Sequence, residues 1–156
     1  MKKLLLILIV LLVVAPAKAD LTTWIFGEGD AVTARVGMTL DPNNVEIGIA
    51  STWHPTSEAP QIYTVYGLYM FDQVVPFRQP LPVDFLPETL EAQPYIIGTV
   101  GIDLENEDRR GLASLGAGVI VQQVLVIEYS FQAVSDYLEE SMADTHKVSF
   151  GLRWQF

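Results

Sequence analysis

The sequence predicts an all-β fold, in which eight antiparallel strands close in up-and-down order into a transmembrane β-barrel behind a cleaved signal peptide. Three observations lead to this prediction. Segments of roughly 8 to 12 residues alternate apolar and polar positions, which is the period of a β-strand. One face of these segments is apolar and aromatic, while the other carries glycines, hydroxyls and a few charges. A short basic and apolar stretch precedes all of them.

The N-terminal stretch, residues 1–19, has the three parts of a secretory signal. Lys2 and Lys3 are followed by an unbroken apolar run over 4–14, then by Pro16 and the small-residue site Ala17-Lys18-Ala19. The run is too short to span a bilayer as a helix, and the flanks fit removal better than a retained anchor, which is the alternative. We therefore expect cleavage after Ala19 and a single domain over 20–156.

The charge of the mature chain excludes several functions. Three of the nine basic residues lie in the signal. The mature chain therefore has six basic and 19 acidic residues, and its net charge is −13. A chain this acidic repels phosphates, so no nucleic-acid partner is expected. The chain has no cysteine, which excludes disulfides, cysteine metal sites, thiol catalysis and a lipoprotein anchor.

The alternation predicts each strand in turn. It is clearest at the C-terminus, where an apolar row faces Lys147, Ser149, Gly151 and Arg153. The first segment alternates weakly, and the fourth is apolar on both faces, so its inward side stays unassigned. The expected strands are 21–28, 31–40, 44–53, 61–71, 94–104, 111–122, 124–133 and 147–156.

The links between these strands differ in length. Residues 41–44 (DPNN) form a strong tight turn, and Gln122-Gln123 allows another. Residues 54–60, 105–110 and 134–145 make longer polar connections. The exception is 72–93, whose four prolines argue against a ladder strand and whose length argues against an ordinary hairpin.

The polar face decides which side of the barrel is buried. Glycines weaken exposed strands, but a crowded lumen needs small residues beside long charged ones. Paired charges there avoid isolated burial, and we expect Glu128 and Arg153, on adjacent strands, to pair. The expected lumen charge network is Arg35, Glu46, Asp103, Glu128, Lys147 and Arg153. The alternative is a soluble secreted carrier of the lipocalin kind, which would turn its apolar face inward.

Three segments resemble small outer-membrane barrels of the OmpA-like transmembrane-domain type. These are Pro94-Tyr95-Ile96-Ile97-Gly98-Thr99-Val100-Gly101, Leu115-Gly116-Ala117-Gly118-Val119 and the final strand 146–156. The resemblance covers 94–156 best, and the long segment 72–93 departs from the short periplasmic turns usual in that family. It implies an integral outer-membrane barrel with periplasmic termini. It also implies a C-terminal assembly signal for the barrel-insertion machinery, made of Phe150, Leu152, Trp154 and Phe156.

Some small barrels modify lipid A, which would require catalytic residues that converge at the outer rim. His54, Ser57 and Glu58 share one predicted external loop, but their spacing matches no known motif. His146 and Ser149 have opposite parity and cannot form a dyad. The acidic loops 103–108 and 136–144 do not follow a calcium-loop pattern. We therefore expect no catalysis, no cofactor and no metal.

The expected function is a structural or surface-interaction role in the outer membrane. The expected partners are outer-membrane lipid and lipopolysaccharide, with the insertion machinery during biogenesis, and we expect a monomer. Binding or passage of a small hydrophobic ligand is the main alternative, motivated by the two-sided apolar strand 61–71. A lipid-A-modifying enzyme using His54 is a weaker one.

Overall fold

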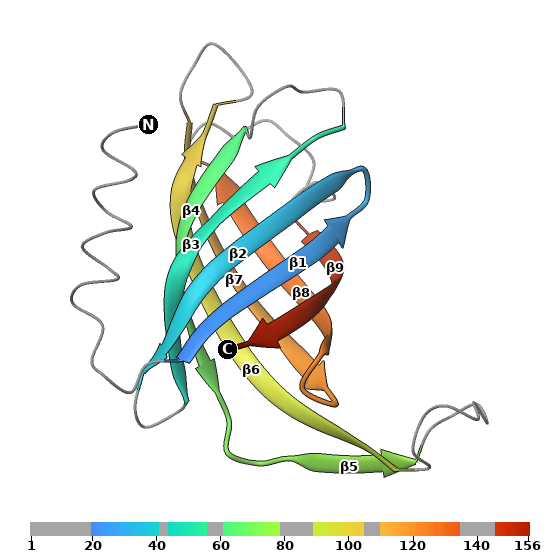
Figure 1. Cartoon of the computed structure of the whole chain (residues 1–156). Coiled ribbons are helices and arrows are strands. Elements are labelled where there is room, and N and C mark those ends of the chain that lie inside the picture. The colour runs from blue at the N-terminus through green and yellow to red at the C-terminus, as the bar shows by residue number, and fades with distance from the viewer. Residues whose placement is uncertain (1–19, 41–43, 56–60, 79–88, 105–109, 135–145) are drawn as a thin grey trace.

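A computed structural model describes residues 20–40, 44–55, 61–78, 89–104, 110–134 and 146–156. The expected signal peptide and most of the three longer links lie outside these residues, as does most of the 41–44 turn. No helix in the described part of the chain is long and apolar enough to cross a membrane. All regular elements there are strands (Figure 1). They are β1 (Asp20–Glu28), β2 (Ala31–Leu40), β3 (Val45–Trp53), β4 (Ile62–Met70), β5 (Val75–Arg78), β6 (Thr89–Asp103), β7 (Arg110–Val121), β8 (Leu125–Val134) and β9 (His146–Gln155).

Eight of these strands form a closed antiparallel barrel. The barrel strands are β1–β4 and β6–β9, and each pairs with the next one along the chain. β4 therefore pairs directly with β6, and β9 pairs with β1 to close the barrel. Two further bonds close the seam between the termini: Gln155 Nε2 donates to Asp20 Oδ2 at 2.8 Å, and the Phe156 amide donates to the Leu21 carbonyl at 2.8 Å. The expected number of barrel strands and their up-and-down order are confirmed.

Two short turns connect strands by backbone conformations that few residues adopt. Gly29 lies between β1 and β2 with φ +60°, which costs a glycine little. Gln122 and Gln123 join β7 to β8 with φ of 51° and 63°, and the Val124 amide donates to the Val121 carbonyl at 3.1 Å. Two positive φ values define a type I′ turn, so the short link expected there is present.

The described chain has one strand more than expected, β5. It contradicts the expectation that 72–93 holds no ladder strand. Val75–Arg78 pairs with Thr89–Ala92, the first residues of β6. Pro76 fits because β5 is the last strand of the sheet, and proline is tolerated on an edge strand. The four prolines in 72–93 therefore did not exclude pairing.

The faces of the strands follow the expected parity. Outward positions remain apolar and exposed, as at Val100 (62%), Leu115 (72%) and Phe150 (62%). Strand β4, unassigned before, turns Tyr66, Leu68 and Met70 inward. Ten polar or charged residues of the described chain are buried: Thr22, Thr33, Arg35, Thr39, Glu46, Thr52, Glu128, Ser130, Ser149 and Arg153. This distribution is the opposite of what a lipocalin-like carrier needs.

Candidate functional site

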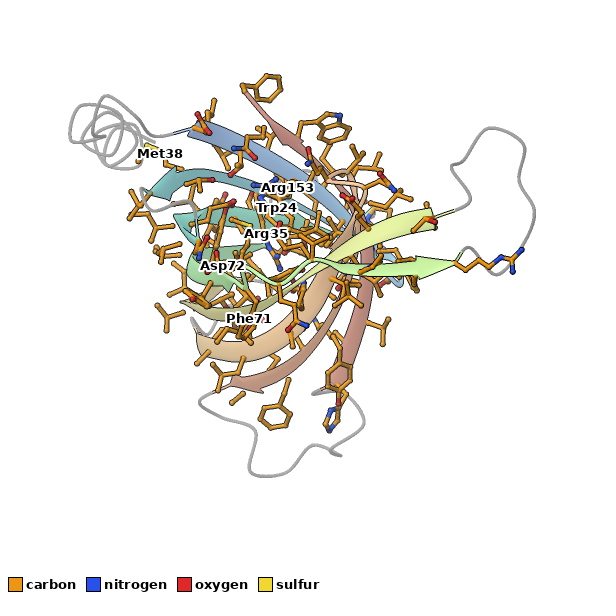
Figure 2. The ribbon with its side chains drawn as sticks, turned by 90° about the horizontal axis from the view of Figure 1, so that it is seen from below. Trp24, Arg35, Met38, Phe71, Asp72 and Arg153 are labelled. Carbon is orange, nitrogen blue, oxygen red and sulfur yellow. The ribbon has the colours of Figure 1, made fainter. Side chains whose placement is uncertain are left out.

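The lumen brings together charges that are far apart in the sequence (Figure 2). Arg35 on β2 meets Glu128 on β8, and the guanidinium makes two hydrogen bonds to the carboxylate, at 2.6 and 2.7 Å. Both side chains are almost fully buried, at 6% and 2% exposure. A bidentate pair of this kind is among the strongest hydrogen-bonded arrangements in proteins.

Aromatic groups complete the surroundings of this pair. The Tyr95 hydroxyl donates to Glu128 Oε2 at 2.7 Å. The Arg35 guanidinium carbon lies 4.3 Å from the centre of the Phe26 ring, within the range of a cation–π contact. The carboxylate therefore has three donors and the cation has a ring face, so both charges are compensated inside the barrel.

Glu46, which has no exposed surface, is the centre of a second cluster. Its Oε1 accepts from the Trp24 indole N–H at 2.7 Å and from the Tyr66 hydroxyl at 2.6 Å. Arg153 approaches its Oε2 at 3.6 Å and lies 5.1 Å from the centre of the Trp24 ring. The two clusters bring opposite charges in equal number into the lumen.

The expected pairing of Glu128 with Arg153 is wrong. Ser149, not Arg153, lies opposite Glu128 in the register of β8 and β9. Arg153 is four residues further along β9, beside Trp24, and is therefore close to Glu46 instead.

The other residues named from the sequence lie outside this buried pair of clusters. Asp103 and Lys147 are half-exposed on the loop side of the barrel, where each makes interactions of its own. The four residues expected to form the assembly signal all point outward and are exposed: Phe150, Leu152, Trp154 and Phe156.

An aromatic layer fills the lumen around the charges, and the sequence reasoning missed it. The rings of Trp24 and Phe26 stack with centres 5.8 Å apart, and Tyr95 meets Trp24 edge-on at 5.8 Å. A signal was present, because 21–28 and 61–71 carry large apolar residues on both faces. Such strands place aromatic rings in the interior as well as outside.

Inward glycines make room for these rings. A Cβ atom built at each would fall within 3.0 Å of a ring atom, closer than real contacts allow. The ring of Tyr66 lies against Gly48, that of Tyr95 against Gly118, and that of Phe26 against Gly151. The lumen glycines were expected beside long charged residues, whereas these three lie beside aromatic ones.

Replacing one such glycine should destabilise the barrel. In Gly118→Ala the new Cβ would lie 2.6 Å from Cζ of Tyr95 and 2.6 Å from the Ile127 carbonyl oxygen. Overpacking typically costs about 1–3 kcal/mol, and we expect that loss in the free energy of unfolding measured in urea. Gly67→Ala is the control, because a Cβ there meets no atom within 4 Å. Equal stability of the two variants would contradict the packed lumen.

A polar cavity of about 50 Å³ lies on the loop side of the Arg35–Glu128 pair. Hydroxyl groups line it, and two pairs bond directly: Thr33 with Thr52 at 2.8 Å, and Thr99 with Ser114 at 2.6 Å. A polar space of this size accommodates water but no organic substrate. On the side of this cavity that faces away from the loops, the aromatic layer and the ion pairs fill the lumen.

The outer wall carries a larger, apolar groove. Gly67 on β4 lies opposite Gly98 on β6, with Ile47 and Leu115 beyond them on either side. No atom crowds either glycine on the outer side. The outer surface is therefore hollow at the glycine pair, between the side chains of Ile47 and Leu115. Two hollows of about 570 and 520 Å³ share this glycine pair and Leu115.

The histidines form no catalytic group among the described residues. His54 lies 3.8 Å from Asp30, while its expected neighbours Ser57 and Glu58 fall outside the described ranges. His146 bonds to the Tyr129 hydroxyl on the outer surface, whereas Ser149 faces the lumen. No cluster of potential metal ligands occurs in the part of the chain that the structure describes.

Comparison with solved structures finds two similar barrels. One is a designed transmembrane β-barrel, with a TM-score of 0.44 and 12% identity, matched over 91% of this chain and 98% of that one. The other is the N-terminal β-barrel domain of Pseudomonas aeruginosa OprF, with a TM-score of 0.45 and 9% identity, over 88% and 96%. No family model and no curated protein matches the sequence.

Proposed function

We propose that this chain is an integral outer-membrane β-barrel with a structural or surface-interaction role and no catalytic activity. One observation carries the proposal: charged residues are buried in the lumen while large apolar residues cover the outside. Soluble monomers rarely expose contiguous apolar patches of more than a few hundred Å². A membrane barrel has this distribution because its outer face contacts hydrocarbon.

Aromatic residues near both ends of the barrel support this orientation. Trp154 and Phe156 lie at the end that holds the chain terminus, where Tyr69 and Phe71 also pack edge to face at 5.4 Å. Phe131 lies beside His146 at the opposite, loop end. Aromatic rings prefer the membrane–water interfaces, so these two groups fit the two edges of an apolar band.

The location and partners follow from the same proposal. Residues 1–19 direct export and are removed after Ala19, leaving 20–156 as the barrel. The exposed C-terminal row Phe150, Leu152, Trp154 and Phe156 serves the insertion machinery. The mature barrel is a monomer surrounded by outer-membrane lipid and lipopolysaccharide, with no cofactor.

Cell fractionation tests the location directly. The protein should appear in the outer-membrane fraction. It should also migrate faster on a gel before boiling than after it, because a folded barrel resists detergent until heated. Recovery in the soluble periplasmic fraction, with no shift on heating, would overturn the proposal.

A second candidate function, binding of a small hydrophobic ligand, is favoured by the groove at Gly67 and Gly98. The two open hollows there have apolar walls, as ligand sites commonly do. Filling the groove in the double variant Gly67→Leu, Gly98→Leu should abolish binding of a fluorescent fatty acid to the refolded barrel in vesicles. Thr23→Leu, outward on the distant strand β1, is the control. Unchanged binding in the double variant would remove this function.

A further inference from the structure

Strand β5 and the start of β6 form an arm at the edge of the sheet, beside the closed barrel. β6 is the longest of the described strands, with 15 residues, and its segment Thr89–Ala92 pairs with β5. Thr89–Glu91 lie beyond the ladder with β7, which begins at Ala92. Both views show this pair of strands projecting past the barrel (Figures 1 and 2). It leaves the barrel at the end where β9 finishes at the C-terminus. We call these eight residues, 75–78 and 89–92, the arm.

The arm is fixed to the barrel rather than hinged on it. The Gln122 amide donates to the Glu91 carbonyl at 2.9 Å, and Gln122 Nε2 lies 3.4 Å from the Thr89 carbonyl oxygen. Next to the arm, where β6 is already part of the barrel, the Phe71 amide donates to the Pro94 carbonyl at 3.0 Å. Gln122 makes these bonds from a positive φ that few non-glycine residues adopt. The β7–β8 turn therefore holds the arm in one direction.

The two faces of the arm differ in character. Cross-strand partners point to the same face of a sheet, and successive residues alternate. The register consequently places Val75, Phe77, Leu90 and Ala92 on one face. The other face carries Pro76, Arg78, Thr89 and Glu91, all of them exposed.

The apolar face continues the outer face of the barrel. Leu90 and Ala92 have the same parity along β6 as Ile96 and Val100, which point outward and are exposed. Val75, their neighbour on β5, is itself 44% exposed. The apolar outer surface of the barrel thus reaches the arm at Val75, next to the partly exposed Phe77 and Ala92, while Leu90 is buried at 8% exposure.

We propose that the arm is an interfacial anchor, whose apolar face lies against the lipid leaflet at the terminus end of the barrel. This inference rests on the proposed membrane location. The arm leaves the barrel close to Phe71, in the aromatic group assigned above to that interface. Amphipathic elements bind at this depth by burying one face in the boundary between headgroups and acyl chains. Arg78, exposed on the polar face, is placed to contact lipid phosphates.

The absence of cysteine makes this inference testable by site-directed spin labelling of the full chain, refolded into vesicles of phosphatidylethanolamine and phosphatidylglycerol. Val75→Cys places a label on the apolar face, and Glu91→Cys places the matched label on the polar face. Val100→Cys reports barrel insertion, and Asp30→Cys, in the β1–β2 turn, reports exposure to water. Collisions with oxygen and with a water-soluble nickel complex then measure the surroundings of each label.

We expect the label at residue 75 to resemble that at 100, with oxygen access several-fold above nickel access. The label at 91 should resemble that at 30. Equal nickel access at 75 and 91, with residue 100 protected, would overturn the anchor while leaving the membrane barrel intact. Shielding of residue 75 from both reagents would also overturn it, because it would indicate contact with protein. Nickel access at residue 100 would instead reject the membrane barrel itself.

Discussion

Glu128→Ala should remove much of the stability of the barrel. The substitution leaves the Arg35 guanidinium buried at 6% exposure without its carboxylate partner. Breaking a buried ion pair by removing one partner typically costs about 3–5 kcal/mol, because the remaining charge is uncompensated. The Tyr95 hydroxyl loses its acceptor as well. We expect the free energy of unfolding in urea, measured on the refolded barrel in vesicles, to fall by about this amount.

A double variant separates the charge effect from the loss of packing. In Arg35→Met, Glu128→Met both charges are gone, and apolar replacement of a complete buried pair is often neutral or stabilising. The double variant should therefore be much more stable than Glu128→Ala. Glu91→Ala, on the exposed face of the arm, should be neutral. Additive losses at the two positions would show that the pair is not coupled as the structure indicates.

The prediction from sequence was strongest where one face of a strand is small and polar. Along β9, Lys147, Ser149, Gly151 and Arg153 alternate with large apolar residues, and β8 repeats the pattern. Two-residue periodicity fixes the side of each residue once the faces differ in chemistry. The inward and outward sides of these strands were therefore correct before the structure was known.

The contacts across the lumen could not be predicted in the same way. Arg35 and Glu128 are 93 residues apart, on strands that are not neighbours in the barrel. Which charges meet depends on the tilt and stagger of all eight strands, and alternation within one strand carries no information about either. For this reason four of the six expected charges lie buried in the lumen, at Arg35, Glu46, Glu128 and Arg153, whereas the expected partner of Glu128 was wrong.

The inward aromatic residues were hidden for a different reason. Periodicity identifies a face by contrast, and β1 and β4 have apolar residues on both sides. Trp24 and Tyr66 take the inside because their polar atoms reach Glu46 there, at 2.7 and 2.6 Å. A buried carboxylate therefore determines where these rings point, and a single strand pattern cannot reveal that partner.

Val100→Arg should prevent or strongly destabilise insertion of the barrel. Val100 lies outward on β6, is 62% exposed, and is well removed from the C-terminal strand, so the assembly signal stays intact. In water an arginine at so exposed a site would change stability by only about 0.5 kcal/mol or less. A lipid-facing arginine costs about 2–4 kcal/mol at the bilayer midplane, and Val100 lies inside the proposed membrane-spanning part of β6, three residues before its loop end. The same substitution thus has a small effect in water and a large cost in lipid.

Leu104→Arg provides the matched control at the loop end of the same outward row, where Leu104 is 39% exposed. The cost of a lipid-facing arginine falls to about 0–1 kcal/mol near the interfaces. Folding yield in vesicles, followed by the shift in gel mobility on heating, should therefore drop sharply for residue 100 and little for residue 104. Equal and small effects at both positions would mean that the exposed apolar face contacts water. Leu104 directly follows β6 and continues its parity, so the comparison holds parity and substituted charge constant, and the difference between the two variants measures depth in the membrane.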